Sequence, residues 1–213
     1  MMEKADNTIP SREELAAYIK ESAVSVTNSY EQSPVVLMVD DAIIGTLGNF
    51  SASIGKAKSK KTFNVSAIVA SALSGNTVLH YRSMFPEDKQ KILYIDTEQG
   101  QHHCQQVLKR ILRLAELPDD EKPDNLLMLS LRKFAPKIRM LIVEEAIGTI
   151  PDLGLVIIDG IRDFLRIKQS RQENIMCDIH VLPSFRDLYH LMFSSECQFT
   201  IRIRYGVSGS INR

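Results

Sequence analysis

A short lysine-rich segment carries the residue types that bind phosphate. It runs Gly55-Lys56-Ala57-Lys58-Ser59-Lys60-Lys61-Thr62 and contains no acidic residue. It matches the phosphate-loop pattern G-x-x-x-x-G-K-S/T at every defined position except one, where Lys60 stands in place of glycine. Backbone amides in such a loop and the N-terminus of the following helix present partial positive charge to phosphate oxygens. The segment therefore predicts a polyphosphate site, and the alternative interpretation is a solvated lysine-rich loop.

The end of the segment provides the chemistry that a bound nucleotide needs. We expect Lys61 to reach the β- and γ-phosphate oxygens and the Thr62 hydroxyl to hold Mg²⁺. Lys60 removes the backbone freedom that a glycine provides where φ is positive. The candidate nucleotide-binding residues are Gly55, Ser59, Lys60, Lys61 and Thr62.

Two apolar runs that end in acids could complete the site. Leu155 to Asp159 has the form of a Walker B strand, whose carboxylate orders the Mg²⁺ shell. Ile92 to Glu98 places further carboxylates just beyond another strand. In a parallel sheet these ends share the carboxyl edge, where ligands bind, and Glu98 is then placed to polarise an attacking water. The alternative for Asp96 is a helix N-cap.

Strands and helices must alternate to position these residues. Near-continuous apolar strands separated by amphipathic helices predict an α/β fold with a parallel sheet covered on both faces. The expected strands are 35–39, 50–55, 91–96, 126–129 and 154–159, and the expected helices cover 65–73, 107–115 and 136–146. Ser11 and Glu14 form a capping box that begins an N-terminal helix. The alternation from Phe199 to Tyr205 predicts a half-exposed strand near a sheet edge.

Composition restricts the class of protein. The 213 residues are 44% hydrophobic and 24% charged, which is typical of a folded globular chain. There is no run of 18 apolar residues and no apolar stretch behind the first residues, so we expect a cytoplasmic protein that does not cross a membrane. The 26 basic residues equal the 26 acidic residues, yet this balance conceals four lysines between residues 51 and 62.

The cysteines and histidines point to no metal or disulfide framework. Cys104, Cys177 and Cys197 are widely spaced and form no C-x-x-C pair. His102, His103 and Cys104 are consecutive, and consecutive helical residues point about 100° apart, so we expect ordinary residues there rather than ligands.

Three segments together resemble one family. Gly55 to Thr62, Tyr94 to Glu98 and Val156 to Gly160 resemble the RecA-like P-loop ATPases, particularly the RepA-type ATPase domains of plasmids and mobile elements. The resemblance covers about residues 35–165 and implies a RecA-like three-layer P-loop NTPase with a mainly parallel central sheet. It implies ATP and Mg²⁺ as cofactors, with Lys61 and Thr62 on the nucleotide and metal, Asp159 on the metal and Glu98 as catalytic base. DNA and further copies of the chain are the implied partners.

Two departures from the family keep two functions open. One is Lys60, and the other is the region after Leu165, which shows no match and suggests a truncated or altered C-terminal end. We therefore expect an N-terminal helical segment (1–30), an ATPase core (35–165) and a tail (166–213) that completes or replaces the last strands. The first hypothesis is an ATPase, stimulated by DNA, that acts in DNA replication or mobilisation of a mobile element. The second is a hydrolysis-deficient ATP-binding regulatory or accessory protein.

Overall fold

The computed structural model describes residues 9–56, 61–160 and 198–205, and the chain divides into two units, residues 1–32 and 33–213. The first unit contains α1 (Arg12–Ser22), which begins at the capping box that the sequence predicts. The Ser11 hydroxyl accepts a hydrogen bond from the Glu14 amide at 3.2 Å, and the Glu14 carboxylate accepts one from the Ser11 amide at 2.7 Å. No residue of α1 is buried, and Leu15, Tyr18 and Ile19 are exposed.

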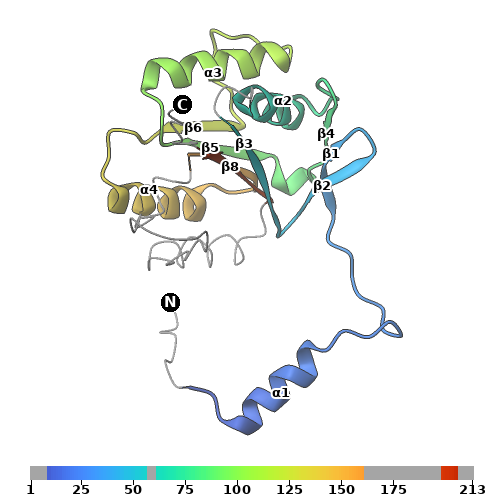
Figure 1. The fold of residues 1–213 in the computed structure, drawn as a ribbon. Helices are drawn as coiled ribbons and strands as arrows, with labels where there is room; N and C mark the ends of the chain where they lie inside the picture. The colour runs from blue at the N-terminus through green and yellow to red at the C-terminus, as the bar shows by residue number, and fades with distance from the viewer. Residues whose placement is uncertain (1–8, 57–60, 161–197, 206–213) are drawn as a thin grey trace, which may run out of the picture. The chain divides into compact units, whose positions relative to one another are not determined.

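A five-stranded sheet forms the centre of the second unit (Figure 1). Its strands, in spatial order, are β3 (Phe50–Lys56), β8 (Gln198–Tyr205), β7 (Leu153–Asp159), β5 (Lys91–Asp96) and β6 (Leu126–Ser130). Every neighbouring pair is parallel. The predicted α/β class with a mainly parallel sheet is confirmed.

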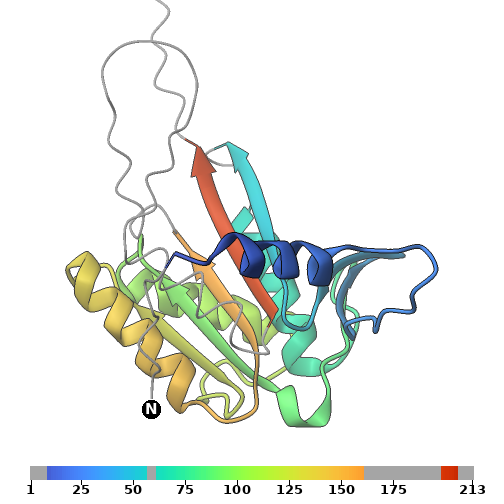
Figure 2. The same cartoon turned by 90° about the horizontal axis from the view of Figure 1, so that it is seen from below.

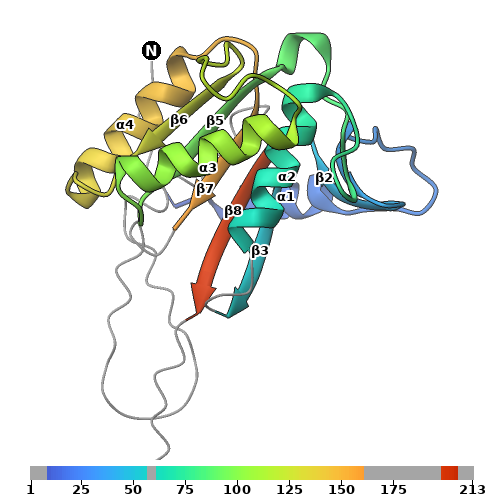
Figure 3. The same cartoon turned by 90° about the horizontal axis from the view of Figure 1, so that it is seen from above.

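Helices cover both faces of this sheet, as Figures 1 and 3 show. On one face α2 (Lys61–Ser74) and α3 (Gln101–Leu114) pack on Tyr94 and Ile157, and on the other α4 (Pro136–Thr149) packs on Leu93 and Ile158. Successive strand residues point to opposite faces of the sheet, and helices cover both faces. For this reason β5 and β7 are buried on both sides. The result is the expected three-layer arrangement.

A smaller antiparallel sheet adjoins the first layer, in the order β2 (Ala42–Thr46), β1 (Val35–Val39) and β4 (Tyr81–Ser83). Val36 and Leu37 of β1 are buried in the same cluster as α2. Asp40 and Asp41 form the two-residue turn between β1 and β2, with Asp40 at a φ of 48°. The sequence predicts β1 but neither β2 nor β4. A short 3₁₀ helix, η1 (Glu87–Lys89), precedes β5.

The last strand, β8, lies near an edge of the sheet, as expected, although β3 and not β8 is the edge strand itself. β8 lies between β3 and β7 and pairs with both, and Figure 2 shows it (red) beside β3 (cyan). Alternation of apolar and polar residues reports the two faces of a strand, whereas its place in the sheet depends on backbone pairing, which leaves no such pattern. Within the described ranges, no helix is both long and apolar enough to cross a membrane.

Candidate functional site

The strand register brings the acidic strand ends together. Asp96 at the end of β5 is the register partner of Asp159 at the end of β7 and of Ser130 at the end of β6. Asp96 is 0% exposed and Asp159 is 1% exposed. Because all these strands are parallel, the three side chains belong to the carboxyl edge of the sheet, where α/β proteins bind ligands.

Asp159 belongs to the face of the sheet that α2 covers. It is in phase with Leu155 and Ile157, which pack beneath α2 and α3. The Tyr94 hydroxyl, from the same face of β5, donates a hydrogen bond to Asp159 Oδ2 at 3.2 Å. The lysine-rich segment leads directly into α2, so this carboxylate and the start of α2 belong to the same face of the sheet.

Asp96 organises the turn that follows β5. Its Oδ1 accepts hydrogen bonds from the backbone amides of Glu98 (2.9 Å) and Gln99 (2.7 Å), and its Oδ2 accepts one from Gln99 Nε2 (2.7 Å). The N-cap of α3 is Gly100, so Asp96 caps this turn rather than the helix. Its carboxylate is thus engaged in holding the backbone of Glu98.

A close contact fixes the same turn against the end of β7. The Thr97 amide donates to the Asp159 carbonyl at 3.1 Å, and the Thr97 hydroxyl donates to the Gly160 carbonyl at 2.7 Å. Gly160 has a φ of 102°, and a Cβ there would overlap Thr97 Oγ1 and lie 2.7 Å from Glu98 Cγ. Only glycine fits this conformation and this space.

Glu98 therefore has a defined place beside Gly160, the residue that follows Asp159. It is half-buried, its Oε2 atom is buried, and its Cγ lies against Gly160. The candidate base and the candidate metal ligand are held on neighbouring strand ends. The sequence alone assigns no role to Thr97 or Gly160, although the glycine directly after the acidic strand end is a visible signal.

The lysine-rich segment joins the end of β3 to the start of α2. β3 ends at Lys56 and α2 begins at Lys61, while Ser59 and Lys60 lie outside the described residues. The Gly55 backbone pairs with β8. Thr62, in the first turn of α2, is half-buried, and its carbonyl accepts a hydrogen bond from the Ser66 hydroxyl at 2.6 Å. Nothing is described of the Lys61 side chain.

The available oxygen donors suit Mg²⁺ bound together with phosphates. A threonine hydroxyl and a carboxylate are hard donors, and Mg²⁺ is usually held by one or two carboxylates plus substrate phosphates. In the part of the chain that the structure describes, no group of three or more His, Cys, Asp or Glu side chains could hold a metal alone. Thr62 and Asp159 therefore fit a nucleotide-dependent metal and not a closed protein cage.

His102, His103 and Cys104 do not converge. Both histidines are exposed on α3, while Cys104 is 5% exposed and faces the core. Burial raises the pKa of the Cys104 thiol, and nearby Asp96 raises it further, so the thiol stays protonated and poorly reactive at neutral pH.

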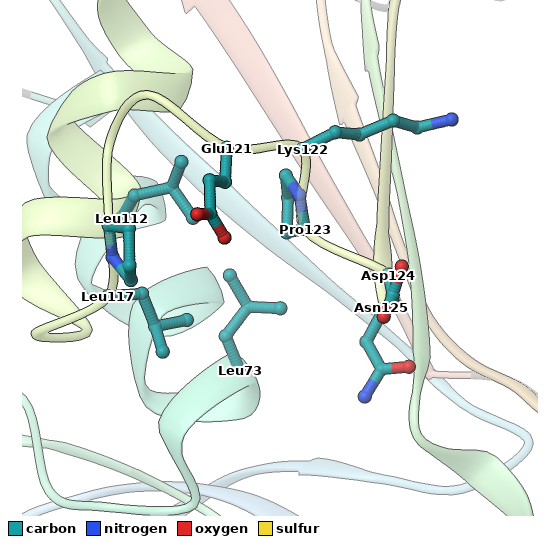
Figure 4. A pocket seen from close by; sticks show the side chains of 9 residues that line it. Leu73, Leu112, Leu117, Glu121, Lys122, Pro123, Asp124 and Asn125 are labelled. Atoms are coloured by element: carbon teal, nitrogen blue, oxygen red, sulfur yellow. The ribbon is translucent and has the colours of Figure 1, made fainter.

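A pocket of about 310 Å³ lies at the opposite edge of the sheet (Figure 4). Leucines at the ends of α2 and α3 gather on one side of it, whereas the Lys122 side chain points away. The lining residues are Leu73, Leu112, Leu117, Pro118, Glu121, Lys122, Pro123, Asp124 and Asn125. These residues lie near the C-terminal ends of α2 and α3 or just before β6. The pocket is therefore at the edge of the sheet where the parallel strands begin, away from the acidic strand ends.

Comparison with known proteins identifies the family of this chain. The family model described as an AAA domain matches residues 25–180, well over half of the chain. Among the solved structures that match is a crystal structure of the RadB recombinase, with 14% sequence identity and a TM-score of 0.48. That match covers 78% of this chain and 66% of the other, so this chain spans about two thirds of its length. None of the curated proteins compared with the chain matches it. The chain belongs to the AAA domain family.

Proposed function

We propose that the chain binds and hydrolyses Mg·ATP at the carboxyl edge of its parallel sheet. One observation supports this proposal: the Glu98 side chain is held against Gly160, directly after Asp159, at the carboxyl edge of the sheet where β3 also ends. Following the resemblance to RepA-type domains, the protein acts on DNA in the cytoplasm, in replication or mobilisation of a mobile element, and assembles with copies of itself.

Each residue type has a distinct task in this reaction. The backbone of the segment from Gly55 to Lys60 and the N-terminus of α2 bind the phosphates, and Lys61 neutralises the β- and γ-oxygens. Thr62 and Asp159 hold Mg²⁺, which when bound neutralises charge that develops on the phosphates. Glu98 accepts a proton from the attacking water and orients it toward the γ-phosphate.

The surrounding hydrogen bonds keep Glu98 in place for this step. Asp96 binds the Glu98 and Gln99 amides, and Thr97 bonds to the backbone at the end of β7. Preorganisation of this kind matters because a misplacement of about 1 Å can lower a rate by about 100-fold. Asp96 and Thr97 are thus positioning residues.

The second candidate is an ATP-binding regulatory or accessory protein without hydrolysis. Lys60 favours it, because a residue with a Cβ replaces the glycine that gives a phosphate loop its backbone freedom. The two candidates share nucleotide binding and differ only in turnover.

Turnover measurements with a matched pair of variants separate the candidates. ATP hydrolysis is measured with and without single-stranded DNA for the wild type, Glu98→Gln and Glu145→Gln, the last an exposed glutamate of α4. We expect Glu98→Gln to lower turnover by about 100-fold or more, with little change in ATP affinity, and Glu145→Gln to have no effect. Binding without turnover in the wild type would support the regulatory alternative, and absence of both would refute each candidate.

A further inference from the structure

The pocket beside the ends of α2 and α3 has an apolar floor. Its volume of about 310 Å³ is typical of a site for a small ligand. Leu73 lies near the end of α2, Leu112 lies near the end of α3, and Leu117 follows α3 and is 39% exposed. In Figure 4 these leucines gather on one side of the pocket. Accessible apolar surface in a concave site favours a ligand with a hydrocarbon part.

Negative charge borders this apolar floor. Glu121 and Asp124 line the pocket, and among the described residues neither carboxylate forms an ion pair. In Figure 4 the Glu121 carboxylate points into the pocket, Asp124 lies across from it, and the Lys122 side chain points away. The chain from Glu116 to Asp124 contains five acidic residues and one basic residue. The pocket therefore attracts cations and repels phosphate groups.

Two helix C-termini add to the negative potential of the pocket. α2 ends at Ser74 and α3 ends at Leu114, directly after residues that line the pocket or close to them. The carbonyl end of a helix carries partial negative charge, which favours a cation within about one turn of it. The last turn of α2 contains no basic residue, so no side chain of that turn compensates this charge.

Two basic side chains near the pocket are already bonded to other groups. Arg113, in the last turn of α3, pairs with Asp119, with 2.6 Å between Nε and Oδ2. Lys91 Nζ donates hydrogen bonds to the Asp124 carbonyl at 3.1 Å and to Asn125 Oδ1 at 2.9 Å. Neither cation contacts the carboxylates of the pocket, so these stay available to a ligand.

The lining residues select an organic ammonium ion rather than a metal ion. The described residues contain no group of three or more His, Cys, Asp or Glu side chains that could hold a metal ion, and leucines give a hydrated metal ion no ligand. None of the lining residues is aromatic, so the pocket lacks the cage of rings that binds quaternary ammonium groups. Carboxylates and helix carbonyls accept hydrogen bonds from primary and secondary ammonium groups.

We propose that this pocket binds an aliphatic polyamine. The methylene groups of the ligand lie on Leu73, Leu112 and Leu117, and its ammonium groups donate hydrogen bonds to Glu121 and Asp124. Lysine side chains combine the same two contacts when their stems cover apolar surface and their charge stays at its border. A polyamine carries charges that are separated by methylene groups, and it therefore matches carboxylates on two sides of an apolar floor. The pocket is away from the acidic strand ends, so this inference does not depend on ATP binding.

Isothermal titration calorimetry of the full chain with spermidine measures this binding. No nucleotide is present, because a polyamine also pairs with the phosphates of ATP. The test variants are Glu121→Gln and Leu117→Ser. The control is Asp120→Asn, which removes the same charge from an exposed neighbouring residue that does not line the pocket. Thermal unfolding checks that each variant is folded.

We expect Glu121→Gln to weaken spermidine binding about fivefold, because it removes a charge-assisted hydrogen bond at a partly exposed site. Leu117→Ser should weaken binding about threefold at low and at high salt, because salt does not screen an apolar contact. Asp120→Asn should change it by less than about twofold. Absence of spermidine binding by the wild type, an equal loss in Asp120→Asn, or equally effective displacement by Mg²⁺ or tetramethylammonium would overturn the proposal.

Discussion

Substitution of Gly160 by alanine tests the geometry around Glu98. The added Cβ would lie 2.7 Å from Glu98 Cγ, against an ordinary contact distance of at least 3.4 Å, and it would overlap Thr97 Oγ1. Glu98 or Gly160 must therefore move by about 1 Å, a displacement that lowers a reaction rate by about 100-fold. We expect ATP turnover to fall by that factor while ATP affinity changes little, because the phosphate-binding segment lies on another strand and helix.

The same substitution has a cost in stability that can be divided into two parts. A non-glycine residue at the Gly160 φ of 102° costs about 1–3 kcal/mol, and the steric overlap adds about 1–3 kcal/mol. Gly48→Ala is the matched control, because Gly48 also has a positive φ (73°) but an added Cβ there meets nothing within 4 Å. It should show the conformational cost alone and normal turnover.

Urea unfolding and steady-state ATP hydrolysis of the two variants provide the comparison. If Gly160→Ala matched Gly48→Ala in both unfolding free energy and turnover, the close approach of Glu98 to the end of β7 would be refuted. Turnover is divided by the fraction of folded protein, which the unfolding curve provides. If the loss of turnover disappeared after this correction, a positioning role of Gly160 would likewise be contradicted.

Three further outcomes are expected from single contacts. Tyr94→Phe should lower the unfolding free energy in urea by about 1–2 kcal/mol, because it removes a buried hydrogen bond to Asp159, and an unchanged value would contradict that bond. In a variant that keeps Cys104 as its only cysteine, Cys104 should react with iodoacetamide at pH 8 at least about tenfold more slowly than a free thiol does, because burial raises the pKa of the Cys104 thiol. Equal rates would show that Cys104 is an accessible thiolate. The hydrogen bonds from Ser11 lower the pKa of Glu14, so the capping of α1 is present above the unfolded pKa of Glu14 and is lost as the pH falls through the folded value. Glu14→Gln should remove this pH dependence of α1 amide exchange, because the main cause is the bond from the Ser11 backbone amide to the ionised Glu14 carboxylate, and its persistence would rule out the capping box as the cause.

Much of the fold could be predicted because charge and proline interrupt the apolar runs. β5 occupies the predicted 91–96, since Lys91 and Asp96 bound a run that is buried on both faces. β4 was missed because three residues with a central arginine carry no recognisable period. The exact partners of β8 could not be predicted, because its parallel pairing with β3 joins segments far apart in the chain, and such pairing leaves no trace in local pattern.

Part of the candidate site could likewise be predicted from the sequence, and part could not. That the carboxylates at the ends of β5 and β7 share one edge follows from parallel strand order, which sequence periodicity can predict. The contact of the Thr97 hydroxyl with the Gly160 carbonyl joins residues 63 positions apart and depends on the register between two strands. Periodicity cannot predict such register, so the roles of these two residues emerged only from the structure.

Nucleotide binding by the segment between β3 and α2 is the central claim. Its most direct test is the equilibrium affinity for Mg·ATP of the wild type, of Lys61→Ala and of Lys58→Ala, which removes the same charge from an undefined position of the same motif. We expect Lys61→Ala to weaken binding at least about tenfold and Lys58→Ala to leave it nearly unchanged. Equal affinity of the wild type and Lys61→Ala would refute nucleotide binding by this segment and leave it as a basic surface.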